Sequence, residues 1–238
     1  MKERNTIMKR LLILILCTVS VMPLLAQEKR GVISVSAREN VVHRLPKDVA
    51  YVFPDFADAT LNYDNGRFSV GCLNIRLLDN YILYIEEKTG DTLVLSNPDQ
   101  VRDLVCMDTV YRIVNDCVVK VISEAGDRQL AQRFRLKLTE EQEDAGYSAL
   151  PPSSTAVTGN VNRIDPSRNP DAKRDFSYKY ERDYVLMDGD KVYPAKISSF
   201  NRLFPEKKKA IKAYVRDNDL DTGTRAGLVA LFDFCAGN

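Results

Sequence analysis

The chain has 238 residues, of which 45% are hydrophobic, and its 34 Lys/Arg nearly balance its 33 Asp/Glu. This length is sufficient for one large domain, or for a domain with a smaller appendage, and for a sizeable hydrophobic core. A net charge so close to zero gives no indication of a nucleic-acid partner or of an anionic membrane surface as a binding site.

Residues 1–26 have the layout of a secretory signal peptide, with a cationic start, an apolar run from Leu11 to Met22 and a cleavage site after Ala26. The apolar run is too short to cross a bilayer, which requires roughly 20 residues, and no second run of spanning length follows. Cys17 follows Leu16 where a lipidation site needs a small residue, so a lipid anchor is not expected. Cleavage removes four Lys/Arg and one Asp/Glu and leaves a net charge of about −2. We expect a soluble periplasmic or secreted protein.

Four cysteines remain after cleavage: Cys72, Cys106, Cys117 and Cys235. An exported chain permits disulfides, but a chain of this length does not depend on them, and the spacings match no metal-binding pattern. Each cysteine stands among apolar residues, which favours burial as a free thiol. A bridge between Cys106 and Cys117 is the alternative, because these two are the nearest in sequence.

The stretch 50–138 is a succession of short β-type runs separated by turn signals, which predicts a meander of about eight antiparallel strands. Asn65 or Gly66 is expected to take a positive φ in the first turn, and Gly90 in a later one. Alternation in several runs predicts one buried and one solvated face. The sequence leaves open whether the sheet closes into a barrel, curls around a ligand or packs against helices.

The amino-acid composition changes after the predicted strands. Residues 139–175 are rich in Pro, Ser, Asn and Asp, and they predict a linker or long surface loop. Residues 176–238 predict a β-hairpin around Asp188-Gly189 and two C-terminal helices, with Pro205 starting a fresh turn or kinking the first helix. Thr222 or Thr224 is expected to cap the last helix. With an N-terminal segment at 27–49, the predicted fold class is α+β, mainly β, with a curved sheet or partial barrel.

Four short elements and a helical tail stand out in these segments, namely Phe53 to Phe56, Asn65-Gly66, Leu73-Asn74, Tyr84-Ile85, and Ser198 to Asp221. In these elements the chain resembles a group of uncharacterised exported proteins common in the Bacteroidetes. Ile75 and Cys72 depart from the usual pattern of the group. The resemblance implies an envelope location and a β-rich fold, but no reaction.

The sequence contains no recognisable catalytic constellation. His43 is the only histidine, so an imidazole zinc site or a Ser-His-Asp triad would have to use it, and we interpret it as an incidental surface residue. Most carboxylates, including Asp64 and Asp190, stand in turn segments, where hydrogen bonds to the local backbone explain them. The cluster Lys207, Lys208, Lys209 and Lys212 is typical of the solvated face of an amphipathic helix.

Asp217, Asp219 and Asp221 alternate in the manner of a calcium-binding loop. However, an EF-hand loop starting at Asp217 would need a glycine at its sixth position and a glutamate at its twelfth, and Thr222 and Leu228 stand there. A capped connection between two helices is therefore the preferred interpretation, and calcium binding through the three aspartates is a minor alternative. We expect these aspartates to be exposed and replaceable by Asn.

Taken together, the sequence favours an exported, non-catalytic binding or assembly module without a cofactor, whose partner is a protein or a small ligand of the envelope. A hydrolase that uses two carboxylates is the alternative. An enclosed apolar cavity would favour ligand binding, a polar cleft with paired acids would favour hydrolysis, and a flat surface would favour a protein partner.

Overall fold

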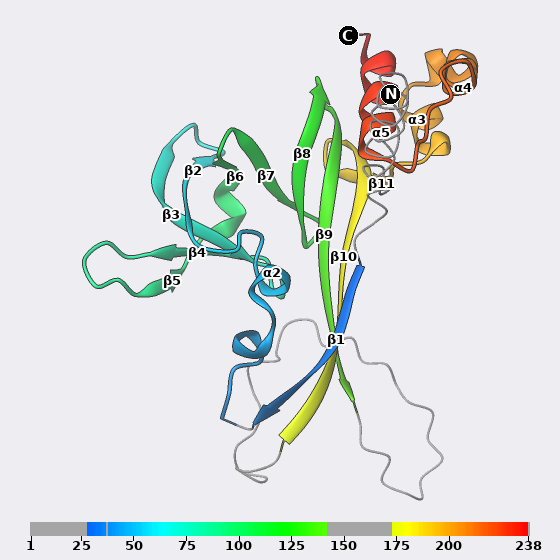
Figure 1. Cartoon of the computed structure of the whole chain (residues 1–238). Coiled ribbons are helices and arrows are strands. Elements are labelled where there is room, and N and C mark those ends of the chain that lie inside the picture. The colour runs from blue at the N-terminus through cyan, green and yellow to red at the C-terminus, as the bar shows by residue number, and fades with distance from the viewer. Residues whose placement is uncertain (1–27, 37, 142–172, 238) are drawn as a thin grey trace, which may run out of the picture.

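A computed structural model describes residues 28–36, 38–141 and 173–237. The predicted signal peptide and most of the predicted linker lie outside the described residues. Within them, eleven strands form one antiparallel sheet that curls into a half-barrel, and short helices follow at the C-terminal end (Figure 1). The mainly-β fold class with a curved, partly closed sheet is confirmed.

The strands are β1 (Glu28–Ser36), β2 (Ala57–Tyr63), β3 (Phe68–Arg76), β4 (Tyr81–Ile85), β5 (Thr92–Val94), β6 (Val101–Cys106), β7 (Thr109–Val114), β8 (Cys117–Ala125), β9 (Arg128–Glu141), β10 (Lys173–Asp188) and β11 (Lys191–Pro194). The helices are η1 (Val41–Arg44), α2 (Lys47–Ala50), η2 (Pro98–Gln100), α3 (Ile197–Leu203), η3 (Pro205–Lys207), α4 (Lys208–Asp217) and α5 (Arg225–Ala236).

The eight strands predicted between residues 50 and 138 are β2 to β9, and the turn between β2 and β3 uses Gly66 at φ 79° as predicted. Their order in space is not a plain meander, however. The sheet runs β1-β10-β9-β8-β7-β6-β2-β3-β4-β5, with β11 beside β10, so β6 pairs with β2 and not with β5. The chain therefore crosses from one side of the β2–β5 unit to the other before β6 begins.

The N-terminal segment, for which the sequence gives little sign of order, is part of the sheet. All nine residues of β1 pair with β10, and η1 and α2 follow. Val41, Val42 and Val49 are buried, whereas His43 is exposed as predicted. The predicted linker is also shorter than expected, because β9 continues to Glu141 and β10 begins at Lys173.

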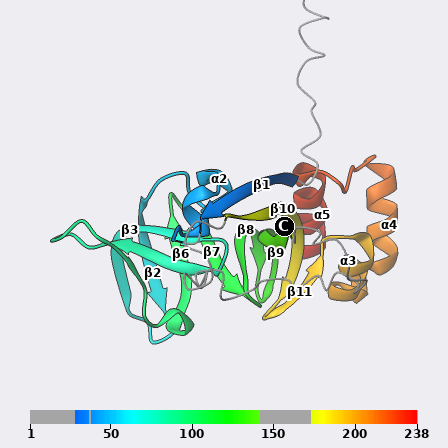
Figure 2. The same ribbon diagram turned by 90° about the horizontal axis from the view of Figure 1, so that it is seen from below.

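The interior of the half-barrel is filled by the largest hydrophobic cluster, to which strands from both halves of the sheet and the η1–α2 segment contribute. Phe53 packs edge-on against Tyr111 with ring centroids 5.1 Å apart, which joins the segment after α2 to β7. Seen from below, the curled strands β2 to β7 lie on one side of the molecule and helices α3 to α5 on the other (Figure 2).

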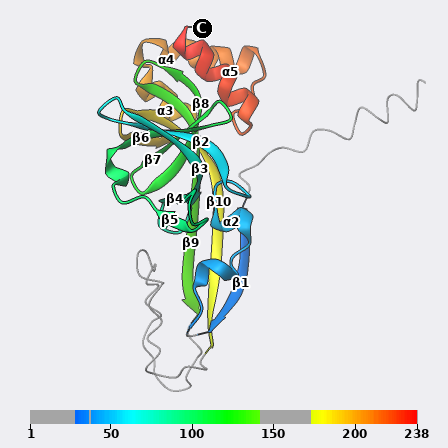
Figure 3. The ribbon, with the colours of Figure 1, turned by 90° about the vertical axis from the view of Figure 1, so that its left-hand side faces the viewer.

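A second cluster lies under the C-terminal helices, at the opposite end of the long strands β9 and β10 from β1 (Figure 3). Leu130 and Leu186 are cross-strand partners, and they pack against helical side chains such as Phe200 and Phe232. Pro205 begins a fresh turn as predicted and separates α3 from α4, and Thr224 caps α5 by accepting a hydrogen bond from Gly227 N–H. No helix in the described part of the chain is long and apolar enough to span a membrane.

The opposite face of the sheet at this end has a small cluster of its own, formed by Val119, Ala131, Val185 and Met187. Ala131 and Val185 are cross-strand partners one position away from Leu130 and Leu186, so their side chains point away from the helices. The strands are thus buried on both faces here. A polar cavity borders this second face.

Candidate functional site

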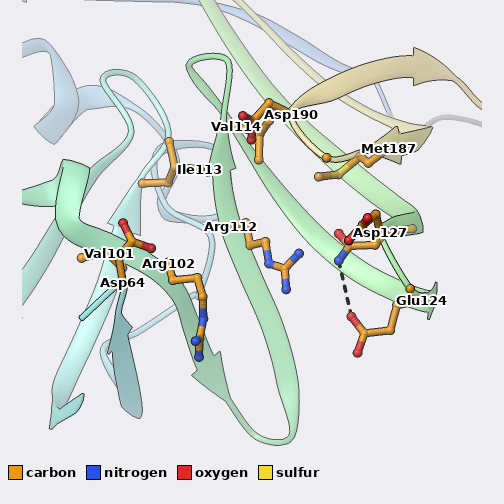
Figure 4. Close-up of a pocket in the computed structure, with 13 residues that line it drawn as sticks. Asp64, Val101, Arg102, Arg112, Ile113, Val114, Glu124, Asp127, Met187 and Asp190 are labelled. Carbon is orange, nitrogen blue, oxygen red and sulfur yellow. Dashed lines mark hydrogen bonds between the residues drawn. The ribbon is translucent and has the colours of Figure 1, made fainter. Parts of the chain in front are cut away.

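A cavity with a volume of about 720 Å³ lies beside the small cluster, between β6–β7 and the turns that join β8 to β9 and β10 to β11 (Figure 4). Its lining combines two arginines, one buried amide, four carboxylates and a few apolar groups. The lining residues are Asp64, Val101, Arg102, Arg112, Ile113, Val114, Glu124, Gly126, Asp127, Gln129, Met187, Gly189 and Asp190.

Strand register explains why residues so far apart in sequence meet in this cavity. Arg112 of β7 is the cross-strand partner of Val119, and Gln129 of β9 is the partner of Met187, so both polar side chains stand on the face of the small cluster. Beside the cavity, the Asn115 side-chain amide donates to the backbone carbonyl of the lining residue Asp190 at 3.0 Å. This bond joins the β7–β8 turn to the β10–β11 turn.

The two arginines of the cavity differ in how they are paired. Arg102 donates to the Asp103 carboxylate at 3.0 Å, and Asn62 donates to the same carboxylate at 2.6 Å. Arg112 is half-buried, has no ion pair within 4.0 Å among the described residues, and leaves its Nε without a hydrogen-bond partner. An unpaired, partly desolvated guanidinium costs free energy, and an anionic group supplied from outside would relieve that cost.

Gln129 also has a side-chain atom without a hydrogen-bond partner, in this case an acceptor. It is 5% exposed, and although its Nε2 donates weakly to Glu124 at 3.4 Å, its Oε1 has no partner. The dashed line in Figure 4 marks the bond to Glu124. A buried amide oxygen without a donor is destabilising by about 1–3 kcal/mol. The cavity is therefore lined by two residues, Arg112 and Gln129, that each leave one buried side-chain atom without a hydrogen-bond partner.

The four carboxylates of the cavity, those of Asp64, Glu124, Asp127 and Asp190, all belong to exposed residues. Three of them stand in turns, between β2 and β3, between β8 and β9, and between β10 and β11. They place negative charge around the cavity, opposite in sign to Arg102 and Arg112.

The aspartates singled out in the sequence lie elsewhere, at the connection between α4 and α5, and all three are exposed as predicted. Asp217 pairs with its neighbour Arg216 at 2.8 Å, and Asp221 Oδ1 accepts a hydrogen bond from Gly223 N–H at 2.8 Å. A Cβ on Gly227 would lie 2.1 Å from the Asp221 carbonyl oxygen, so the connection closes tightly onto α5. Within the described ranges no group of three His, Cys, Asp or Glu side chains is placed to hold a metal ion.

The four described cysteines are free thiols. Cys106 and Cys117 stand on β6 and β8, which are separated by β7, and two strand spacings of about 4.8 Å exceed the reach of a disulfide. Burial raises the pKa of the Cys235 thiol to about 11, against an opposing effect of the Lys207 ammonium. This cysteine lies in the cluster under the helices and is a packing residue.

Sequence reasoning missed Arg112 and Gln129, and it assigned Asp64 and Asp190 to turns without placing them together. Their turn positions are correct, but the cavity arises from pairing between strands far apart in sequence. A weak signal was present in "TVYRIV", where a charged residue interrupts an otherwise mostly apolar strand. Only the strand order identifies which face that residue occupies.

These features define a class of protein: a mainly-β protein with a curled antiparallel sheet, a helical C-terminus and a polar cavity on one sheet face. Comparisons with protein families, with curated proteins and with solved structures find no match to the chain.

Proposed function

We propose that this protein is an exported, non-catalytic binding protein that holds a small dipolar ligand in the cavity beside Arg112 and Gln129. Export is supported by the N-terminal 26 residues, with their cationic start and short apolar run. N-terminal sequencing of the protein recovered from the cell envelope tests this part, since a mature chain is expected to begin at Gln27.

The observation that carries the binding proposal is that two residues lining one cavity each have a buried polar atom without a hydrogen-bond partner. Of the described residues with such an atom, Arg112 and Gln129 line the same cavity. Buried polar groups in folded proteins are nearly always satisfied, and exceptions need a reason. A ligand that accepts from Arg112 and donates to Gln129 supplies that reason.

The charged residues that line the cavity indicate which class of ligand it would bind. Arg112 favours a carboxylate, whereas Gln129 Oε1 and the nearby carboxylates of Glu124 and Asp127 favour an ammonium group or another donor. An amino acid or a short peptide has both ends. The volume of about 720 Å³ accommodates ligands from an amino acid to a tripeptide, within the range of about 300–1,000 Å³ typical of small-molecule sites.

The test is calorimetric titration of the mature protein with a panel of L-amino acids, dipeptides and tripeptides. Arg112→Met removes the guanidinium but keeps an unbranched side chain out to the position of Nε, and it is expected to weaken binding by about 10- to 100-fold. The same substitution is expected to raise the melting temperature, because it removes an unpaired, half-buried charge.

Arg225→Met is the matched control, since Arg225 is an exposed arginine of α5, on the other side of the sheet from the cavity. It should leave both affinity and melting temperature unchanged. Equal affinities of the Arg112 and Arg225 variants would exclude this cavity as the binding site, and neutral sugars binding in place of zwitterions would exclude the proposed ligand class.

A carboxylate-dependent hydrolase is the second candidate, and the gathering of Glu124, Asp127, Asp64 and Asp190 around one cavity favours it. Its test is product analysis by mass spectrometry after incubation with peptide and oligosaccharide mixtures. A hydrolase would release products that disappear in Glu124→Gln or Asp127→Asn, whereas a binding protein leaves every substrate intact.

A further inference from the structure

The first half of β3 is an open sheet edge. On one side, β2 pairs with β3 from Phe68 to Leu73, but on the other side β4 pairs only from Leu73 to Arg76. The described residues place no other strand against Phe68–Cys72 on that side. Figure 1 shows the β4–β5 hairpin projecting from the sheet beside β3.

The unpaired backbone groups of this edge follow from the ladder. Tyr63 N–H donates to the Arg67 carbonyl at 2.9 Å on the β2 side, and the β2–β3 register shows no bulge. Alternate residues of an antiparallel strand direct their N–H and C=O groups to opposite sides. The backbone groups of Phe68, Val70 and Cys72 therefore point to the open side.

A groove with a volume of about 710 Å³ runs along this edge. Leu61, Leu73 and Leu95 are among its apolar lining residues, and Ile85 lines it from the end of β4. On the outer face of the same edge, Val70 is 68% exposed and Phe68 is 70% exposed. An added strand would thus find apolar surface on both of its faces.

Two other edges of the sheet have features that prevent strand addition. β5 is only three residues long, and β1 carries Glu28, Lys29 and Arg30 at its start. The open stretch of β3 has the sequence FSVGC, which contains neither a charge nor a proline. This stretch therefore lacks those features.

The charges around the groove indicate the chemistry of its occupant. Asp58, Glu86 and Glu87 line it, and Lys88 is the single cation among the lining residues. We propose that this edge binds an extended peptide segment of a partner protein by strand addition, with apolar side chains alternating with Lys or Arg. The added strand bonds to Phe68, Val70 and Cys72 and places alternate apolar side chains in the groove. This interaction does not depend on the cavity beside Arg112.

The test uses the full mature protein and the probe peptide acetyl-Lys-Val-Lys-Val-Lys-Val-Lys-amide, with binding followed by NMR and calorimetry. A strand-added peptide should slow hydrogen exchange of the Val70 and Cys72 amides. Two further peptides, one N-methylated at all Val positions and one at all Lys positions, test whether the probe binds as an added strand, because only one set of peptide amides faces β3. One of these methylated peptides is expected to bind at least about tenfold more weakly than the unmodified probe, and the other to lose much less affinity.

Variants of the protein provide the second arm. Val70→Pro removes an outward amide, whereas Val70→Ala keeps it, so only the proline variant should lose binding, with thermal melting confirming that both fold. The double variant Glu86→Lys, Glu87→Lys should weaken binding of the cationic probe and strengthen binding of a peptide that has Glu in place of each Lys.

Equal binding of both N-methylated peptides, or no binding of the unmodified probe at millimolar concentration, overturns the proposal. A dimer of the protein alone that Val70→Pro dissociates also overturns it, since the edge then binds a second copy.

Discussion

At the scale of single residues, Asn74 shows how two short sequence elements become one piece of structure. Its side chain is 1% exposed, accepts a hydrogen bond from Phe53 N–H at 3.2 Å and donates to the Phe53 carbonyl at 3.1 Å. The amide thus takes the place of a neighbouring strand for the segment that follows α2. The Leu73-Asn74 pair and the Phe53–Phe56 element, noted separately in the sequence, meet at this point.

Asn74→Ala is expected to lower the free energy of unfolding by about 2–4 kcal/mol, because it leaves the N–H and C=O of Phe53 buried without partners. Urea titration followed by circular dichroism measures the change. Asn97→Ala is the control, since Asn97 is exposed and makes no capping bond at η2. A loss below about 1 kcal/mol would mean that water replaces the missing amide.

At the scale of strands, charged side chains form a network across β1, β9 and β10. Arg133 donates to Asp183 at 3.1 and 2.5 Å, and Arg135 pairs with Glu181 at 3.2 Å. Lys179 pairs with Glu181 as well. The hydrogen bond from Lys179 is the main cause that lowers the pKa of the Glu181 carboxyl below its usual value of 4.5, with burial opposing it.

A lowered pKa in the folded state makes this contribution to stability dependent on pH. The unfolded chain binds the proton first, so the contribution is complete above pH 4.5 and is lost as pH falls through the lower folded pKa. In Glu181→Gln we expect a lower urea midpoint at pH 7 and a smaller drop in that midpoint between pH 5 and pH 3. Glu87→Gln, an exposed residue of the β4–β5 hairpin, is the control. If the urea midpoint of Glu181→Gln falls between pH 5 and pH 3 as much as that of the wild type, the Glu181 carboxylate does not make this pH-dependent contribution to stability.

The strands also show what the sequence could and could not predict. β2 to β9 were predictable because alternation and turn residues are local signals, as at Gly66. β1 has alternating residues as well, but its partner β10 begins at Lys173, and no local signal identifies so distant a pairing. The same limit applies to the site, since Arg112 and Asp190 become neighbours of one cavity only through the strand order.

At the scale of the whole molecule, two strands join its two main hydrophobic clusters. β9 has 14 residues and β10 has 16, and their pairing extends without interruption from Asp188 to Asp175. Phe134 and Tyr180 on these strands belong to the cluster inside the half-barrel, whereas Leu130 and Leu186 belong to the cluster under the helices. Figure 3 shows this continuity from α3–α5 to β1.

Continuous strands through both clusters should make the described fold unfold in one cooperative transition. Phe232 is fully buried under the helices, with its ring centroid 6.0 Å from that of Phe204, so Phe232→Ala is expected to cost about 3–5 kcal/mol. Because the clusters share β9 and β10, that loss should also raise hydrogen exchange at the far end, in β1 and the β10 residues around Phe176. Phe68→Ala removes the same atoms from an exposed position and should change neither stability nor exchange by much. If exchange rises only in α3–α5 and β11, the helical end unfolds by itself and the long strands do not couple the two clusters.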